Sequence, residues 1–191
     1  MDAHPSASWR SRDDREDFVP RSQLLNADDV RRAVRRMAHE VVERVRDTDS
    51  LVLLGLQTGG VPFAEFLAAS LCEITSQHVD QGTLDVSFYR DDLDRRPFVA
   101  GTASSVPVDL NDRRVLLVDD VLFTGRTIRC ALNALGDFGR PRAVQLAVMV
   151  DRGHRELPIR PDYVGKNLPT SLDEEIVATV EGVWIGTRSP R

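Results

Sequence analysis

Two adjacent carboxylates and a hydroxyl-rich turn follow one another in the middle of this chain. The carboxylates are Asp119 and Asp120, and the turn reads Thr124, Gly125, Arg126 and Thr127. Amides at the start of a helix have no intrahelical partner, and a glycine lets the backbone approach a ligand, so such a turn suits a phosphate monoester. Adjacent carboxylates can accept hydrogen bonds from a vicinal diol. The two features together predict a site for a ribose 5-phosphate.

The elements that must position these residues are a buried strand before them and a helix after them. Val115–Val118 is a run of branched apolar residues, typical of a strand that is buried on both faces. Ile128–Leu135 has the periodicity of a helix. Neither the Walker pattern GxxxxGK nor the Rossmann pattern GxGxxG occurs here. The alternative, a buried strand followed by a solvated acidic turn, would not require both the paired carboxylates and the Thr-Gly-Arg-Thr sequence.

Four segments of the chain resemble a known family. VLLVDDVLFTGRT at residues 115–127 looks like the phosphoribosyl pyrophosphate (PRPP) signature of the type I phosphoribosyltransferases. RAVRRMAHE at 32–40, YRDDL at 89–93 and GRPRAVQLAVMVDRGHRELPIRPDYVGKNLPTS at 139–171 narrow the resemblance to the PyrR family. Members of that family are pyrimidine operon attenuators that also act as uracil phosphoribosyltransferases. The resemblance covers roughly residues 26–180.

An α/β fold is expected on two grounds. Strand patterns alternate with helical patterns, which favours parallel strands with ligands at their carboxyl edge. The resemblance implies the type I phosphoribosyltransferase fold, in which helices flank a mainly parallel central sheet, with a small hood and a flexible lid loop, here Arg90–Val106. The expected strands are Leu51–Leu56, Leu84–Tyr89, Val115–Val118, Ala143–Val150, Ile176–Val180 and Val183–Ile185. The expected helices begin near Asn26, Pro62 and Thr127.

Length and composition indicate one domain. The chain has 191 residues with 41% hydrophobic content, and residues 22–191 are expected to form this domain after a disordered tail over residues 1–21. No apolar run approaches membrane-spanning length and the N-terminus is not signal-like, which favours a cytoplasmic protein without a membrane partner. The net charge of −5 restricts any nucleic-acid surface to a local patch.

The resemblance implies a reaction and a set of site residues. Uracil and PRPP would give UMP and diphosphate, with Mg²⁺ carried by PRPP and not by protein side chains alone. The predicted catalytic residues are Asp119, Asp120 and Arg90. The predicted PRPP and phosphate contacts are Val121, Leu122, Phe123, Thr124, Gly125, Arg126 and Thr127, together with the diphosphate loop Thr58, Gly59 and Gly60. The predicted base contacts are Tyr163, Val164 and Lys166.

The diphosphate loop departs from the family pattern, which has Thr-Arg-Gly where Thr58, Gly59 and Gly60 stand. Losing one charge-assisted hydrogen bond costs about 1.5–3 kcal/mol, or roughly ten- to a hundredfold in PRPP affinity or rate. Hypoxanthine-type relatives use Gly-Gly at this place, so a working transferase and a regulator with weak or no catalysis both stay open. Phe123 stands where purine-specific relatives place an Asp, which favours a pyrimidine.

The first helix has an apolar and a basic face. A solvated surface explains the basic face from charge alone, whereas the resemblance implies that it binds the leader mRNA of a pyrimidine operon under the control of UMP or UTP. The predicted RNA contacts are Arg35, Arg36, His39, Arg44, Arg155, Arg160 and Lys166. Lys166 thus has two alternative roles, at the base and at the RNA. The resemblance also implies a homo-dimer or a tetramer.

Overall fold

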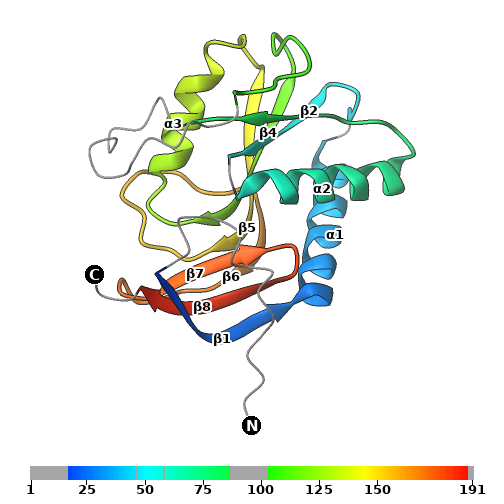
Figure 1. The fold of residues 1–191 in the computed structure, drawn as a ribbon. Coiled ribbons are helices and arrows are strands. Elements are labelled where there is room, and N and C mark those ends of the chain that lie inside the picture. The colour runs from blue at the N-terminus through cyan, green and yellow to red at the C-terminus, as the bar shows by residue number, and fades with distance from the viewer. Residues whose placement is uncertain (1–16, 46, 58, 87–102, 189–191) are drawn as a thin grey trace.

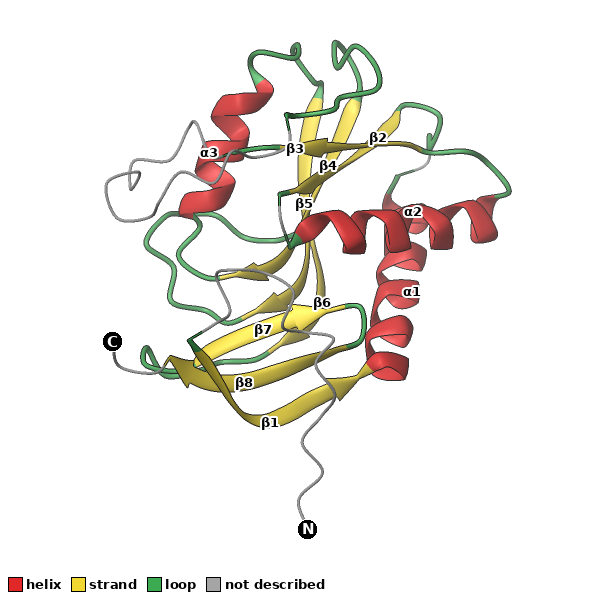
Figure 2. Cartoon of the chain, viewed as in Figure 1, coloured by secondary structure: helices red, strands yellow, loops and turns green. Residues whose placement is uncertain are grey.

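The computed structural model describes residues 17–45, 47–57, 59–86 and 103–188. Its elements are β1 (Phe18–Asn26), α1 (Ala27–Arg44), β2 (Leu51–Leu56), α2 (Gly60–Thr75), β3 (Asp80–Leu84), β4 (Arg114–Leu122), α3 (Arg126–Leu135), β5 (Ala143–Asp151), β6 (Tyr163–Asn167), β7 (Glu175–Thr179) and β8 (Gly182–Arg188). They form a five-stranded parallel sheet of order β3-β2-β4-β5-β6 and an antiparallel sheet of order β1-β8-β7 (Figures 1 and 2). The predicted α/β fold with a mainly parallel central sheet is confirmed, and the antiparallel sheet is the predicted hood.

The parallel sheet is buried on both faces, because successive residues of a strand point to opposite sides. Helices α1 and α2 lie on one side of the sheet and α3 lies on the other (Figure 1). On β4, Leu116 and Val118 belong to the core that includes α1 and α2, whereas Val115 and Leu117 belong to the core that includes α3. This alternation predicts the faces of Asp119 and Asp120, whereas beyond them Val121 packs against the first of these cores and Leu122 belongs to the second.

Helix α1 forms as its sequence predicts. The Asn26 side chain accepts a hydrogen bond from the amide of Asp29, and the Asp29 carboxylate accepts one from the amide of Asn26, which caps the helix reciprocally. Its apolar residues at helical spacing are buried, namely Val30, Val34, Met37, Ala38 and Val41. The basic residues Arg35 and His39 lie on the exposed side.

Two strands differ from their predicted positions. Pairing with β5 continues as far as Leu122 opposite Asp151, so β4 does not end at Val118 but carries both carboxylates within it. Strand β3 lies at Asp80–Leu84, before the predicted strand Leu84–Tyr89, whose later residues are outside the described part of the chain. As an edge strand, β3 tolerates polar residues and glycine, and for this reason its sequence lacks the apolar pattern by which a strand is recognised. β6 was not predicted.

Residues 18–21, which were predicted from sequence to lie in the tail, are part of β1. This strand pairs with β8 from Phe18 opposite Arg188 to Asn26 opposite Gly182, and Phe18 is only 6% exposed. Two register shifts interrupt the alternation by which the strand could have been recognised. Residues 1–16 and most of the predicted lid, residues 87–102, lie outside the described residues.

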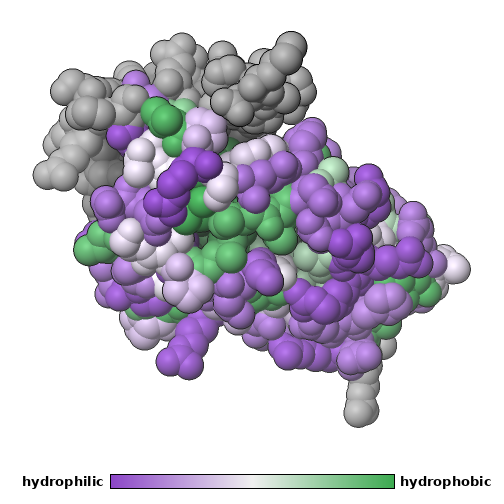
Figure 3. All heavy atoms as spheres, turned by 90° about the horizontal axis from the view of Figure 1, so that it is seen from below, coloured by the Kyte–Doolittle hydropathy of each residue, from purple (hydrophilic) through white to green (hydrophobic). Residues whose placement is uncertain are grey.

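The outer surface near the antiparallel sheet is mixed in character. Seen from below, the molecule shows a hydrophobic patch bordered by hydrophilic residues (Figure 3). Val19 and Leu24 of β1 are among the exposed large hydrophobic side chains. Pro20 and the register shifts make the outer edge of β1 a poor template for further strand pairing. Among the described helices, none combines the length and apolar character that crossing a bilayer requires.

Candidate active site

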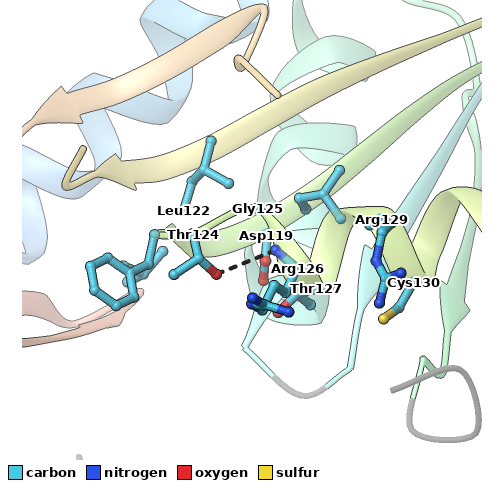
Figure 4. A pocket seen from close by; sticks show the side chains of 11 residues that line it. Asp119, Leu122, Thr124, Gly125, Arg126, Thr127, Arg129 and Cys130 are labelled. Atoms are coloured by element: carbon cyan, nitrogen blue, oxygen red, sulfur yellow. Dashed lines mark hydrogen bonds between the residues drawn. The ribbon is translucent and has the colours of Figure 1, made fainter. Parts of the chain in front are cut away.

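A cavity of about 250 Å³ lies where β4 passes into α3 (Figure 4). Its lining contains the predicted phosphate turn, one of the predicted carboxylates and three residues that the sequence analysis did not identify, Ile128, Arg129 and Cys130. The full lining is Asp119, Val121, Leu122, Phe123, Thr124, Gly125, Arg126, Thr127, Ile128, Arg129 and Cys130. The cavity therefore brings together residues that the sequence assigned to phosphate and ribose.

The phosphate turn has the geometry that its residues predict. Gly125 has φ +91°, a left-handed conformation that glycine adopts without strain, and no side chain caps α3 at this residue. The amide of Arg126 has a long contact of 3.4 Å to Thr124 Oγ1, drawn as the dashed line in Figure 4. Because the start of α3 borders the cavity without a side-chain cap, an anion in the cavity can take the place of the cap.

The two predicted carboxylates lie on opposite faces of β4. Asp119 follows Leu117 onto the α3 side, is 8% exposed and lines the cavity. Asp120 follows Val118 onto the other side and does not line the cavity. Each carboxylate also accepts a hydrogen bond from the next amide along the strand, at 3.0 Å for Asp119 and 2.8 Å for Asp120. The structure thus separates the pair that the sequence treated as one diol-binding unit.

Asp120 lies instead against the predicted diphosphate loop. A Cβ atom added at Gly59 would lie 2.1 Å from Asp120 Oδ2, and one added at Gly60 would lie 2.1 Å from the carbonyl oxygen of Val118. The start of α2 therefore packs on the backbone of β4, and both glycines are required by this close approach. Thr58, the remaining predicted loop residue, and the predicted catalytic residue Arg90 lie outside the described residues.

Of the three predicted base contacts, Tyr163 lies in the hydrophobic core and not at the surface of the site. It is 0% exposed and belongs to the core on the α1 side, so its ring cannot pack on a base, and burial raises the pKa of its hydroxyl. Val164 is half-buried on the opposite face, where it pairs with Val148, the neighbour of Asp119. Lys166 is exposed further along β6. The alternation of β6 thus leaves Val164 and Lys166 as base candidates.

The predicted RNA contacts fall into two groups. Arg35, His39, Arg160 and Lys166 are exposed. The guanidinium groups of the other three are hydrogen-bonded within the protein, although Arg36 and Arg44 are exposed as well. Arg36 donates hydrogen bonds to the carbonyl oxygens of Val164 and Gly165, both at 2.8 Å, and Arg44 donates to the carbonyl oxygen of Asp162 at 3.0 Å. Arg155 Nη1 donates a hydrogen bond of 2.7 Å to the carbonyl oxygen of Phe123, the residue just before the phosphate turn.

The described residues contain no group of three or more His, Cys, Asp or Glu side chains that could hold a metal ion. Asp119 and Asp120 still offer carboxylate oxygens, which Mg²⁺ prefers, at the carboxyl end of β4. Because Mg²⁺ keeps several ligands from water or substrate phosphates, such a donor set fits an ion that arrives with a polyphosphate substrate.

Comparisons with known proteins identify the family. Residues 20–181 match the phosphoribosyl transferase domain family. The protein named Bifunctional protein PyrR from Deinococcus radiodurans is 54% identical over 161 residues, which cover 83% of this chain and 87% of the relative. The protein of the same name from Streptomyces coelicolor is 57% identical over 154 residues, which cover 80% of each chain.

Solved structures agree at the level of the fold. A hypoxanthine phosphoribosyltransferase from Staphylococcus aureus superposes with a TM-score of 0.67 at 20% identity, over 90% of this chain and 94% of that one. The enzyme of the same activity from Trypanosoma cruzi gives a TM-score of 0.69 at 16% identity, over 89% and 98%. From the extent and level of these matches, the chain belongs to the PyrR family of phosphoribosyl transferase domain proteins.

Proposed function

We propose that this protein transfers the 5-phosphoribosyl group of PRPP to uracil, giving UMP and diphosphate, and that it regulates pyrimidine genes by binding RNA in response to UMP or UTP. The observation that carries the proposal is the cavity that places Asp119 beside the uncapped start of α3. A carboxylate and an anion site within one cavity match the ribose and the 5-phosphate of one nucleotide.

Catalysis in this arrangement would come from positioning and electrostatics. The amides and hydroxyl groups of Thr124–Thr127 would hold the 5-phosphate at the start of α3. The negative charge of Asp119 would favour the positive charge that develops on the ribosyl group as the diphosphate departs. Mg²⁺ carried by PRPP would neutralise the diphosphate, and Asp119, the carboxylate that lines the cavity, could contribute a ligand oxygen.

The walls of the cavity support a pyrimidine as the base. Phe123 is half-buried and lines the cavity, and Val164 is a half-buried apolar residue on β6, where it pairs with Val148, the neighbour of Asp119. An apolar residue at 123 offers no carboxylate to assist at a purine ring. Uracil, which is small and flat, can be held by apolar walls and by backbone groups that read its edge.

The catalytic half is tested by an assay of the purified protein with uracil, PRPP and Mg²⁺. We expect UMP and diphosphate to form, and hypoxanthine in place of uracil to give no nucleotide. A protein that binds UMP in a titration but forms none in the assay would establish the alternative, a regulator with weak or no catalysis. In that case Gly59→Arg, which restores the family residue, is the variant to compare.

The regulatory half is supported by Arg35 and His39, which are exposed one turn apart on α1, and by exposed Arg160 and Lys166. A gel-shift titration on the leader RNA of a pyrimidine operon tests it, with and without UMP. We expect UMP to tighten binding and Arg35→Ala to weaken it about equally at either UMP concentration, because a phosphate contact contributes independently of the nucleotide. An RNA affinity that changes neither with UMP nor with Arg35→Ala would exclude the regulatory function.

A further inference from the structure

Three side chains of the loop after β5 converge on Phe123, the residue just before the phosphate turn. The guanidinium carbon of Arg152 lies 4.1 Å from the centroid of the Phe123 ring. The ring of His154 meets the same ring edge-on, with centroids 5.6 Å apart. Arg155 Nη1 donates a hydrogen bond of 2.7 Å to the carbonyl oxygen of Phe123. Both the ring and the backbone of Phe123 are thus held by this loop.

The remaining donors of Arg155 are also used within the protein. Nε donates to the carbonyl oxygen of Ile159 at 2.9 Å, Nη1 also to that of Gly153 at 2.9 Å, and Nη2 to Asp151 Oδ2 at 2.6 Å. The Arg155 side chain is 20% exposed. A guanidinium has five N–H donors, so little of this group is left to bind a phosphate of RNA.

Arg152 is anchored in the same way and is 7% exposed. Its Nε donates to Thr170 Oγ1 at 3.0 Å and its Nη2 to the carbonyl oxygen of Glu174 at 2.6 Å. Burial lowers the pKa of the Arg152 guanidinium. The negative charges of Glu175 and Glu174 act in the opposite direction and raise this pKa. Arg152 therefore connects Phe123 to the turn that leads into β7.

The same loop also supports the phosphate turn itself. The carbonyl oxygen of Thr124 accepts hydrogen bonds from the amides of Glu156 and Leu157, at 3.1 and 3.3 Å. Arg126 Nε donates to Glu156 Oε2 at 2.7 Å. The loop therefore holds Phe123, just before the phosphate turn, and Thr124 and Arg126 within it.

We propose that Arg155 and Arg152 are positioning residues of the nucleotide pocket, which act through Phe123 and couple the occupancy of the pocket to the conformation of residues 152–157. This inference rests on the proposed function, because the ligand is a uridine 5′-phosphate in the cavity. If the loop holds the phosphate turn in its binding geometry, a bound nucleotide must stabilise the loop by the same free energy. The loop of the predicted RNA surface then senses the nucleotide.

The test is calorimetric titration of UMP into the full chain. We expect Arg155→Ala to weaken UMP binding about tenfold, the effect of one charge-assisted hydrogen bond. In the transferase assay, the KM for PRPP should rise more than kcat falls, because the loss is in holding the phosphate. Arg155→Lys should recover part of the affinity, since an ammonium can reach one carbonyl but not all partners. Arg140→Ala, which removes an exposed arginine outside the cavity lining, should leave UMP affinity unchanged.

Two further measurements keep the inference testable if Arg155→Ala does not fold. Phe123→Leu keeps an apolar wall but removes the ring that Arg152 and His154 contact, and we expect it also to weaken UMP. In the native chain, UMP should slow amide hydrogen exchange of residues 152–157, and in Arg155→Lys this protection should be smaller. If the Arg155 and Phe123 variants bind UMP as tightly as the native chain does, the inference is overturned and the proposed function is unaffected. A native chain that does not bind UMP would overturn both.

Discussion

Asp119 is the side chain on which the proposed transfer depends most directly. It lines the cavity at 8% exposure, on the face of β4 that leads to the start of α3. A carboxylate in such a place is shielded from bulk water, so its charge acts on a bound ribosyl group more strongly than an exposed carboxylate would. Asp120, on the other face, lies against Gly59 of the predicted diphosphate loop.

Asp119→Asn should lower kcat for UMP formation roughly a hundredfold, because the amide keeps the shape of the side chain but not the negative charge. Initial rates at saturating uracil and PRPP measure this. Asp112→Asn is the matched control, since Asp112 is exposed before β4 and its left-handed backbone, φ +57°, also suits Asn. An Asp119→Asn variant as fast as the control would remove Asp119 from the mechanism.

Gly59→Ala should lower kcat/KM for PRPP about tenfold, because a Cβ atom 2.1 Å from Asp120 Oδ2 forces that carboxylate to move. For the same reason, we expect Gly59→Arg not to raise the rate above that of the native chain. Steady-state kinetics with varied PRPP measures both variants. A faster Gly59→Arg enzyme would mean that the missing guanidinium limits catalysis and that Asp120 relocates at little cost.

At the scale of elements, α1 covers the open edge of the parallel sheet. β6 is the last strand. Arg44 donates a hydrogen bond to the carbonyl oxygen of Asp162, just before this strand, and Arg36 donates one to that of Val164 within it. The guanidinium of Arg44 also lies 5.2 Å from the centroid of the Tyr163 ring. These contacts satisfy edge groups that would otherwise be open to another strand.

Arg36→Ala should therefore reduce the free energy of unfolding by about 1 kcal/mol, since it leaves two carbonyl oxygens of β6 without their partner. Its neighbour Arg35 makes no side-chain hydrogen bond to any described residue, so Arg35→Ala should change stability by less than about 0.5 kcal/mol. Urea denaturation compares the two variants. RNA binding should show the reverse order, and equal stability of both variants would contradict the edge-covering role of Arg36.

At the scale of the whole molecule, polar contacts around residues 170–174 connect the two sheets. Arg152, at the end of β5, donates to the carbonyl oxygen of Glu174, and the Glu174 carboxylate pairs with Arg21 of β1. The amide of Ser171 also donates to Glu174 Oε2 at 2.9 Å. One turn thus touches both the hood and the sheet that carries the cavity.

The Ser171 hydrogen bonds, followed by Arg21, hold the pKa of Glu174 below its ordinary value of 4.5. A carboxylate whose pKa is lowered on folding adds stability that is complete above the unfolded pKa and is lost as the pH falls through the folded pKa. Glu174→Gln should therefore lose less stability than the native chain between about pH 5 and pH 3. Urea denaturation across this range measures it, with the exposed Asp173→Asn as control. Identical acid dependence in Glu174→Gln would show that the pairing is not formed.

The parts of this architecture that could be predicted from sequence are those written in local patterns. The buried strands β2, β4 and β5 each contain an apolar run, and the phosphate turn is contiguous in the chain. The strands missed or misplaced, β1, β3 and β6, are edge strands. An edge strand needs fewer apolar residues, so its pattern is weak.

The details of the site that could not be predicted depend on pairing between distant residues. Asp119 and Asp120 lie on separate faces because β4 continues to pair with β5 past them, which no local pattern reveals. Arg155 reaches the carbonyl oxygen of Phe123 across 32 positions of sequence. From sequence, Arg155 is predicted as an RNA contact, and only the folded chain shows which protein groups it meets.

Side chains of β4 alternate between the two faces of the sheet, and this limits which residues can be deleted from the strand. Removing one codon from 115–118 would exchange the faces of the two acids, turning Asp119 toward α2 and Asp120 toward the cavity. Removing two codons would preserve the facing of both acids and shorten the strand. A peptide is therefore better inserted at the exposed bend at Asn111 and Asp112, before β4 begins, where length can change without inverting the strand.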